Sequence, residues 1–125
     1  MIATVLVVDD DPNARLLVRT VLEHAGHSVV EASNGLQGLQ CAAAAAPNLV
    51  LLDLSMQTMG GAEFIRTLRA QPKTRNTVVA LYTATPMNPA LRDFMEIYAI
   101  DCVVPKPSEP LELVSAVERA LERTR

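Results

Sequence analysis

The 125-residue sequence predicts an α/β domain built on a doubly wound, five-stranded parallel sheet. Short apolar runs alternate with longer segments that carry an apolar stripe at helical spacing, which is the pattern of repeated strand–helix units. Three of the five runs are continuously apolar, as expected for strands that helices cover on both faces. Five units are too few for a closed parallel barrel, which needs about eight, so an open sheet is expected.

The first half of the chain supplies two strand–helix units. Residues 5–8 form the first predicted strand, and the helix after it ends at Gly26, a natural terminator. The second strand is predicted at residues 28–31. A second helix begins near Leu36, continues through a run of alanines and stops before Pro47. The apolar stripe of the first helix consists of Ala14, Leu17, Val18, Val21, Leu22 and Ala25.

The second half supplies three more units, with strands predicted at residues 49–52, 78–82 and 102–104. Each is followed by a segment with apolar residues at three- and four-residue steps, which predicts a helix. Ser108 is the expected cap of the last helix, and Pro110 fits in its first turn. The three stripes are Ala62, Ile65 and Leu68; Leu91, Phe94, Met95 and Tyr98; and Leu111, Val114, Val117 and Leu121.

Composition limits the class of protein. The length and the 50% hydrophobic content predict one folded domain spanning residues 1–125. A net charge of −3 and the scarcity of aromatic residues argue against direct nucleic-acid binding. No apolar segment is long enough for membrane insertion, so we expect a cytoplasmic protein. Cys41 and Cys102 are expected to be reduced and half-buried, and His24 and His27 to be surface residues rather than metal ligands.

Polar residues follow four of the five predicted strands. Asp9 and Asp10 follow the first strand, Asp53 the third, Thr83 the fourth and Lys106 the fifth. In an open α/β sheet, ligands bind at the carboxyl ends of the strands. The topology therefore predicts that these side chains meet at one edge, although any one of them alone would be read as a cap or a surface residue.

This set of side chains indicates phosphoryl chemistry. Clustered carboxylates repel one another unless a cation lies among them, and an oxygen-only site with few protein ligands suits Mg²⁺. A deprotonated carboxylate such as Asp53 can attack phosphorus to give an acyl phosphate. The ammonium group of Lys106, the hydroxyl of Thr83 and backbone amides could then offset the phosphoryl charge. Asp11, which precedes Pro12, is interpreted as a helix cap.

These motifs resemble the receiver domains of two-component signalling, and the resemblance covers essentially the whole chain. It implies a flavodoxin-like fold with strand order 2-1-3-4-5. The residues that carry it are Val7-Val8-Asp9-Asp10-Asp11-Pro12, Leu51-Leu52-Asp53-Leu54-Ser55-Met56 with Gly60-Gly61, Leu81-Tyr82-Thr83-Ala84, and Lys106-Pro107.

The resemblance also implies roles for individual residues. Asp53 would accept a phosphoryl group from a sensor histidine kinase or a histidine phosphotransfer protein. Asp10 and Asp53 would bind Mg²⁺ directly, Asp9 mostly through water, and Ser55 through its backbone carbonyl. Lys106 would pair with the phosphoryl group. We expect no enzymatic activity beyond phosphorylation and dephosphorylation of the chain itself.

Signal output is implied in the same way. The Thr83 hydroxyl and the Ala84 backbone amide would turn toward the phosphoryl group. The loop that carries them would then move and alter the face formed by helix four, strand five and helix five. That face would bind a downstream output protein or domain, and a homodimer is compatible with the same arrangement.

Two positions depart from the family pattern. Val103 stands where the family usually has an aromatic residue that swings inward on activation, and Gln57 stands where it usually has proline. Tyr98 is close in sequence but falls on a helical stripe, so we expect it in the core. The departures favour an alternative, a phosphorylation-independent pseudo-receiver that acts as a scaffold or dimerisation module. The complete set of acidic residues argues against this alternative.

A second alternative is a magnesium-dependent phosphatase of the haloacid dehalogenase type. Such enzymes carry the nucleophile after the first strand in an Asp-x-Asp pattern and need a cap over the substrate. This chain has Asp9-Asp10-Asp11-Pro12 at that position and no room for a cap. No glycine-rich phosphate loop follows any strand, so nucleotide binding is also disfavoured.

Overall fold

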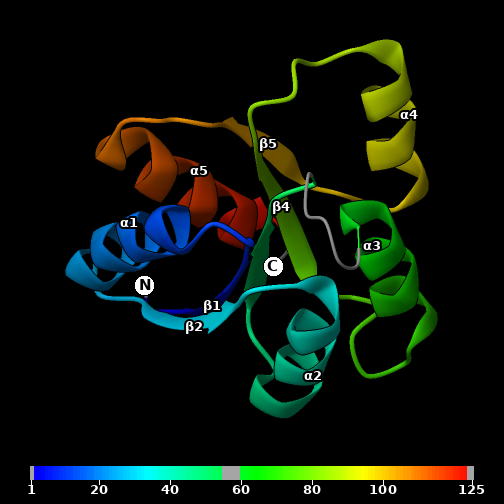
Figure 1. The fold of residues 1–125 in the computed structure, drawn as a ribbon, viewed down its shortest axis with the longest axis horizontal. Coiled ribbons are helices and arrows are strands. Elements are labelled where there is room, and N and C mark those ends of the chain that lie inside the picture. Colours follow the sequence, from blue (N-terminus) through cyan, green and yellow to red (C-terminus); the bar gives the residue numbers. More distant parts are fainter. Residues whose placement is uncertain (1, 55–59, 124–125) are drawn as a thin grey trace.

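The computed structural model describes residues 2–54 and 60–123, and in this part of the chain five strands alternate with five helices (Figure 1). Each predicted strand and helix is present, with ends that differ by only a few residues from those expected. The elements are β1 (Thr4–Val8), α1 (Pro12–His24), β2 (Ser28–Ala32), α2 (Gly35–Ala45), β3 (Leu49–Leu52), α3 (Gly61–Ala70), β4 (Val78–Thr83), α4 (Pro89–Ile97), β5 (Cys102–Pro105) and α5 (Pro110–Arg123).

The sheet is entirely parallel and has the order β2-β1-β3-β4-β5. This confirms the predicted fold class and strand order. The central strands β1 and β3 pair in register, with Val8 opposite Leu52. The next residue of each strand is an aspartate, so the register brings Asp9 and Asp53 to the same edge of the sheet.

Alternate residues of each central strand pack on opposite faces of the sheet. In β1, Val5 and Val7 face a core that includes residues of α1 and α5, whereas Leu6 and Val8 face one that includes residues of α2 and α3. Figure 1 shows α1 beside α5 on one side of the sheet, and α2 beside α3 on the other. The side chains of these four residues are at most 2% exposed. Burying a side chain of this size contributes roughly 1.5–3 kcal/mol, so the two cores fix the register.

Helix α4 has the fewest buried residues of the five helices, since Leu91 is the one that it buries. Tyr98, directly after α4, is half-buried and its ring centroid lies 5.0 Å from that of Phe94, which confirms its predicted packing role. The Arg69 guanidinium donates hydrogen bonds to the carbonyls of Tyr98 at 2.8 Å and Ala99 at 3.1 Å. Burial lowers the pKa of Arg69. The carboxyl end of α4 is therefore anchored to α3.

The prediction that His27 lies on the surface is wrong. Its side chain is fully buried, its Nδ1 atom accepts a hydrogen bond from the Ala3 amide at 3.1 Å, and its Nε2 atom lies 2.9 Å from a carboxylate oxygen of Glu118. Gly26, with a φ of +100°, turns the chain so that the following residue points inward. His27 therefore links Ala3, just before β1, to Glu118 of α5, whereas His24 is exposed, as expected.

We expect His27→Ala to lower the free energy of unfolding by about 2–3 kcal/mol, because it leaves a cavity and removes the acceptor of a buried amide. Denaturant unfolding would measure the loss. His24→Ala is the matched control and should change stability by less than about 0.5 kcal/mol. Equal stabilities for His27→Ala and the wild type would contradict the role of His27 in linking Ala3 to α5.

The helix ends give one confirmation and one correction. Asp11 caps α1 as predicted, since its carboxylate accepts a hydrogen bond from the Asn13 amide at 2.9 Å. Ser108 does not cap α5, because its hydroxyl donates to the carbonyl of Pro105 instead. The Glu112 carboxylate accepts the amide of Glu109 at 3.1 Å, so the first turn of α5 is closed by a glutamate within the helix.

Cys41 and Cys102 are not joined in a disulfide, and both are of intermediate burial, as predicted. Within residues 2–54 and 60–123, no helix has the length and apolar character needed to span a membrane.

Candidate functional site

The carboxyl ends of β1 and β3 bring two aspartates together. The Asp53 amide donates to the carbonyl of Val8 at 3.0 Å, and the Asp9 amide donates to the carbonyl of Ala32 at 3.1 Å. These bonds continue the sheet pattern by one residue beyond the strands. Asp9 is 1% exposed and Asp53 is 5% exposed, so both carboxylates are removed from bulk water.

Asp10 completes an acidic cluster with Asp9 and Asp53. One carboxylate oxygen from each residue lies within 4.8 Å of those of the other two. Asp10 is exposed, so the cluster opens to solvent on one side. Three carboxylates at this spacing repel one another, and hard oxygen ligands of this kind fit Mg²⁺. The donor set therefore suits a divalent cation.

Lys106 supplies the positive charge at this edge. Its Nζ atom lies 2.7 Å from Oδ2 of Asp9 and 3.3 Å from Oδ2 of Asp53. The same atom lies 5.6 Å from the ring centroid of Tyr82. Burial alone would lower the pKa of Lys106, but the hydrogen bonds and negative charges of the two aspartates outweigh it and raise the pKa. The ammonium group is therefore charged at neutral pH and bridges two strand ends.

Thr83 is the last residue of β4 and its side chain is buried. Its hydroxyl donates to the hydroxyl of Thr85 at 3.1 Å and accepts from the Thr85 amide, also at 3.1 Å. The carbonyl of Thr83 accepts the Lys106 amide at 3.0 Å. Thr83 thus lies at the same sheet edge as the acidic cluster, with its hydroxyl turned toward the β4–α4 loop, and Ala84 follows it at an exposed position.

A cleft of about 340 Å³ lies between the β4–α4 loop and β5. Val103, Thr83 and Lys106 all line it. The predicted backbone ligand Ser55 and the departure Gln57 lie outside the described residues.

The start of α3 packs tightly against the segment that follows Asp53. A Cβ atom on Gly61 would lie 2.7 Å from the Cα atom of Leu54, so any larger residue would displace the backbone there. The second glycine of the Gly60-Gly61 pair is required by this close approach.

The chain matches the family model described as the response regulator receiver domain over residues 5–118. It belongs to the receiver family. Receiver domains are the regulatory domains of two-component systems; in general they accept phosphoryl groups, typically use Mg²⁺, and interact with histidine kinases and output domains. This membership confirms the family resemblance drawn from the sequence motifs.

Relatives of this receiver include longer proteins. It is 38% identical over 108 residues to a protein-glutamate methylesterase/protein-glutamine glutaminase of Hahella chejuensis, covering 85% of this chain and 30% of the relative. It is 31% identical over 121 residues to the phosphate regulon transcriptional regulatory protein PhoB of Pseudomonas aeruginosa, covering 97% of this chain and 52% of that protein. The chain thus spans about half or less of the length of these two relatives.

Solved receiver structures share the whole fold. The chemotaxis protein CheY4 of Vibrio cholerae superposes with a TM-score of 0.89 at 28% identity, covering 96% of this chain and 99% of that one.

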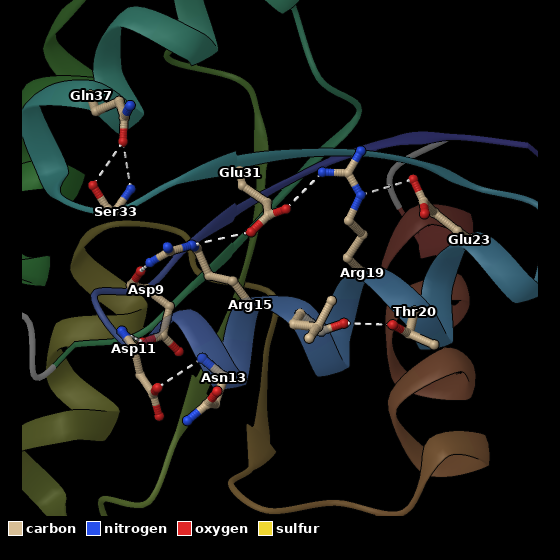
Figure 2. A network of polar contacts seen from close by, with 11 residues as sticks. Asp9, Asp11, Asn13, Arg15, Arg19, Thr20, Glu23, Glu31, Ser33 and Gln37 are labelled. Carbon is tan, nitrogen blue, oxygen red and sulfur yellow. Dashed lines mark hydrogen bonds and ion pairs between the residues drawn. The ribbon is translucent and has the colours of Figure 1, made fainter.

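Sequence reasoning missed one contact at the receiver site, made by Arg15. Its guanidinium donates to the backbone carbonyl of Asp9 at 2.6 Å and to the carboxylate of Glu31 at 3.2 Å (Figure 2). Glu31 was a usable signal, because it is a charged residue inside a strand that pairs in register with the buried Val7. A partly buried glutamate on such a strand requires a cation partner.

Proposed function

We propose that this receiver is a phosphoacceptor switch in which Asp53 accepts a phosphoryl group from a phosphohistidine. The donor would be a sensor histidine kinase or a histidine phosphotransfer protein. The observation that carries the proposal is the Lys106 ammonium group, which contacts the carboxylates of both Asp9 and Asp53. Family membership supports the acceptor role, and the complete acidic cluster opposes the pseudo-receiver alternative.

The transfer can be written with this chain's own groups. A carboxylate oxygen of Asp53 forms a bond to phosphorus while the bond from phosphorus to the donor imidazole nitrogen breaks, and that nitrogen keeps the electron pair. Lys106, within 3.3 Å of Asp53, can neutralise an oxygen of the arriving phosphoryl group. Because Asp53 is nearly buried, water has limited access to the product.

Asp9, Asp10 and Asp53 are the described residues that would hold Mg²⁺, together with the predicted backbone carbonyl of Ser55. Bound there, the ion supplies positive charge that offsets the negative charge of the transferred oxygens. In its absence, the 2.7 Å contact of Lys106 keeps Asp9 partly neutralised.

The output step rests on Thr83 and Ala84. We propose that the Thr83 hydroxyl leaves Thr85 for the phosphoryl group and that the Ala84 amide turns with it. The β4–α4 loop would then shift, and the face formed by α4, β5 and α5 would change its affinity for an output protein or domain, or for a second copy of the chain. We further propose that residues 1–125 act as one receiver unit in the cytoplasm.

Intact mass spectrometry after incubation with a small phosphodonor tests the acceptor role. We expect the wild type to gain one phosphoryl group in the presence of Mg²⁺, because the site needs positive charge to accept it. Chelation of divalent ions should remove the gain. If the wild type stays unmodified by both a small donor and a phosphohistidine protein, the phosphorylation-independent scaffold is the better description.

A further inference from the structure

Every backbone and carboxylate group of Asp9 has a hydrogen-bond partner. Its amide donates to Ala32 at 3.1 Å. One carboxylate oxygen accepts the Asp11 amide at 2.9 Å, and the other accepts the Lys106 ammonium at 2.7 Å. The remaining group, the backbone carbonyl, accepts a hydrogen bond of 2.6 Å from Nη1 of Arg15. Arg15 therefore acts on the backbone of the acidic cluster, not on its carboxylates.

Arg15 is itself held in place. Its side chain is only 16% exposed, and its Nε atom donates to one oxygen of Glu31 at 3.2 Å, while Arg19 donates to the other at 2.7 Å. Figure 2 shows Glu31 between the two arginines, with Arg15 reaching back to Asp9. The hydrogen bond from Arg19, with further help from Arg15, lowers the pKa of Glu31. Glu31 would be ionised at neutral pH without either arginine, and it fixes the Arg15 guanidinium through its own hydrogen bond with Nε.

The Asp9 carbonyl belongs to the peptide unit that leads into Asp10. This unit is planar, so holding the carbonyl also fixes the direction in which the Asp10 Cα atom leaves it. Asp10 is exposed, and the carboxylate that it contributes to the cluster is carried by this backbone. The position of that carboxylate relative to Asp53 therefore depends on the backbone that Arg15 holds.

We propose that Arg15 is a positioning residue for the metal site: by clamping the Asp9 carbonyl it directs the Asp10 carboxylate toward Asp53 and so raises the affinity for a divalent cation. This inference rests on the proposed function, because it concerns the Mg²⁺ site that phosphorylation would use. Partners that orient metal ligands from outside the ligand set commonly change metal affinity by roughly 10- to 100-fold.

The charge of Arg15 and its positioning contact predict opposite changes in Mg²⁺ affinity when Arg15 is replaced. A guanidinium group beside an acidic site repels a divalent cation, so removing the charge alone would tighten Mg²⁺ binding. Removing a positioning contact would weaken it. The sign of the change therefore separates the two effects.

The test is a calorimetric titration of the whole chain with MgCl₂ and no phosphodonor. We expect Arg15→Met to weaken Mg²⁺ binding about tenfold. Arg19→Met is the matched control, since Arg19 also lies on α1 and contacts Glu31 but makes no hydrogen bond to Asp9. It should bind Mg²⁺ as the wild type does. In metal-free protein, the NMR amide signals of Asp10 and Asp11 should move in Arg15→Met and stay in place in Arg19→Met.

Unchanged or tighter Mg²⁺ binding in Arg15→Met would overturn the proposal. If that variant does not fold, Arg15→Lys replaces it, since lysine keeps the charge but cannot reach both Asp9 and Glu31 through separate nitrogens. Weaker binding by Arg15→Lys is then expected, and wild-type affinity would refute the role. A wild type that binds Mg²⁺ but takes no phosphoryl group would refute the proposed function alone, whereas one that binds no Mg²⁺ would refute both.

Discussion

Asp53→Asn is expected to abolish phosphoryl incorporation, down to the level seen with the wild type after chelation. The amide keeps the shape of the carboxylate but lacks its negative charge and its nucleophilic oxygen. Asp9, the other buried carboxylate of the cluster, already accepts the Asp11 amide at 2.9 Å and the Lys106 ammonium at 2.7 Å, so we do not expect it to replace Asp53 as the acceptor. Intact mass and radiolabelled phosphodonor would both measure the loss.

Asp11→Asn is the matched control for this variant. It removes one carboxylate from the same edge of the sheet, but asparagine caps a helix as well as aspartate does, so α1 should be unaffected. We expect this control to incorporate phosphoryl groups at the wild-type level. Wild-type incorporation by Asp53→Asn would instead show that another residue is the acceptor.

The position of the acidic cluster could be predicted because it follows from topology alone. Burial on both faces makes the central strands continuous apolar runs, and β3 was placed at residues 49–52, where the structure has it. Once parallel strands are assigned, the residue after each one must reach the same edge of the sheet. This is why Lys106 and Asp9, 97 residues apart, could be expected together.

The contacts of His27 and Arg15 could not be predicted by the same reasoning. His27 meets Glu118 across 91 residues, and neither residue stands at the end of a strand, so topology does not bring them together. The inward direction of His27 depends on the left-handed conformation of Gly26. For Arg15, the strand residue Glu31 signals a cation partner, but the bond to the Asp9 carbonyl is made to the main chain and leaves no mark of its own in the sequence. The sequence pattern therefore does not predict which way a side chain points after a turn, or which side chains bond to the main chain.

The departure at Val103 bears on signal output rather than on phosphoryl transfer. Val103 lines the cleft beside Thr83 and packs partly against the core that includes α3 and α4 residues. It makes no polar contact with the acidic cluster, whose members are held by Lys106 and by the backbone. The proposed coupling between Asp53 and the α4 side of the fold then runs through the Thr83 loop without a rotating ring at residue 103.

Lys106→Met is expected to lower the free energy of unfolding of the metal-free protein by about 2 kcal/mol. The substitution leaves the buried carboxylates of Asp9 and Asp53 without their shared cation. Removing one partner of a fully buried ion pair costs roughly 3–5 kcal/mol. The cost is smaller here because the Lys106 side chain is 22% exposed. The raised pKa of Lys106 means that this stabilisation is present at neutral pH and is lost only as the pH rises through that value, above the ordinary 10.5. Denaturant unfolding with and without MgCl₂ would measure it.

Mg²⁺ should restore more stability to Lys106→Met than to the wild type, because a bound cation replaces the missing charge without competing with an ammonium group. Lys73→Met, at the only other lysine of the chain, removes the same charge from an exposed turn and should behave as the wild type does. After phosphorylation, Lys106→Met should show smaller shifts of the β4–α4 loop amides in NMR spectra, since the group that we propose to pair with the phosphoryl oxygen is gone. If Lys106→Met had the stability and the loop response of the wild type, both roles proposed for Lys106 would be wrong: stabilising the two aspartates and pairing with the phosphoryl group.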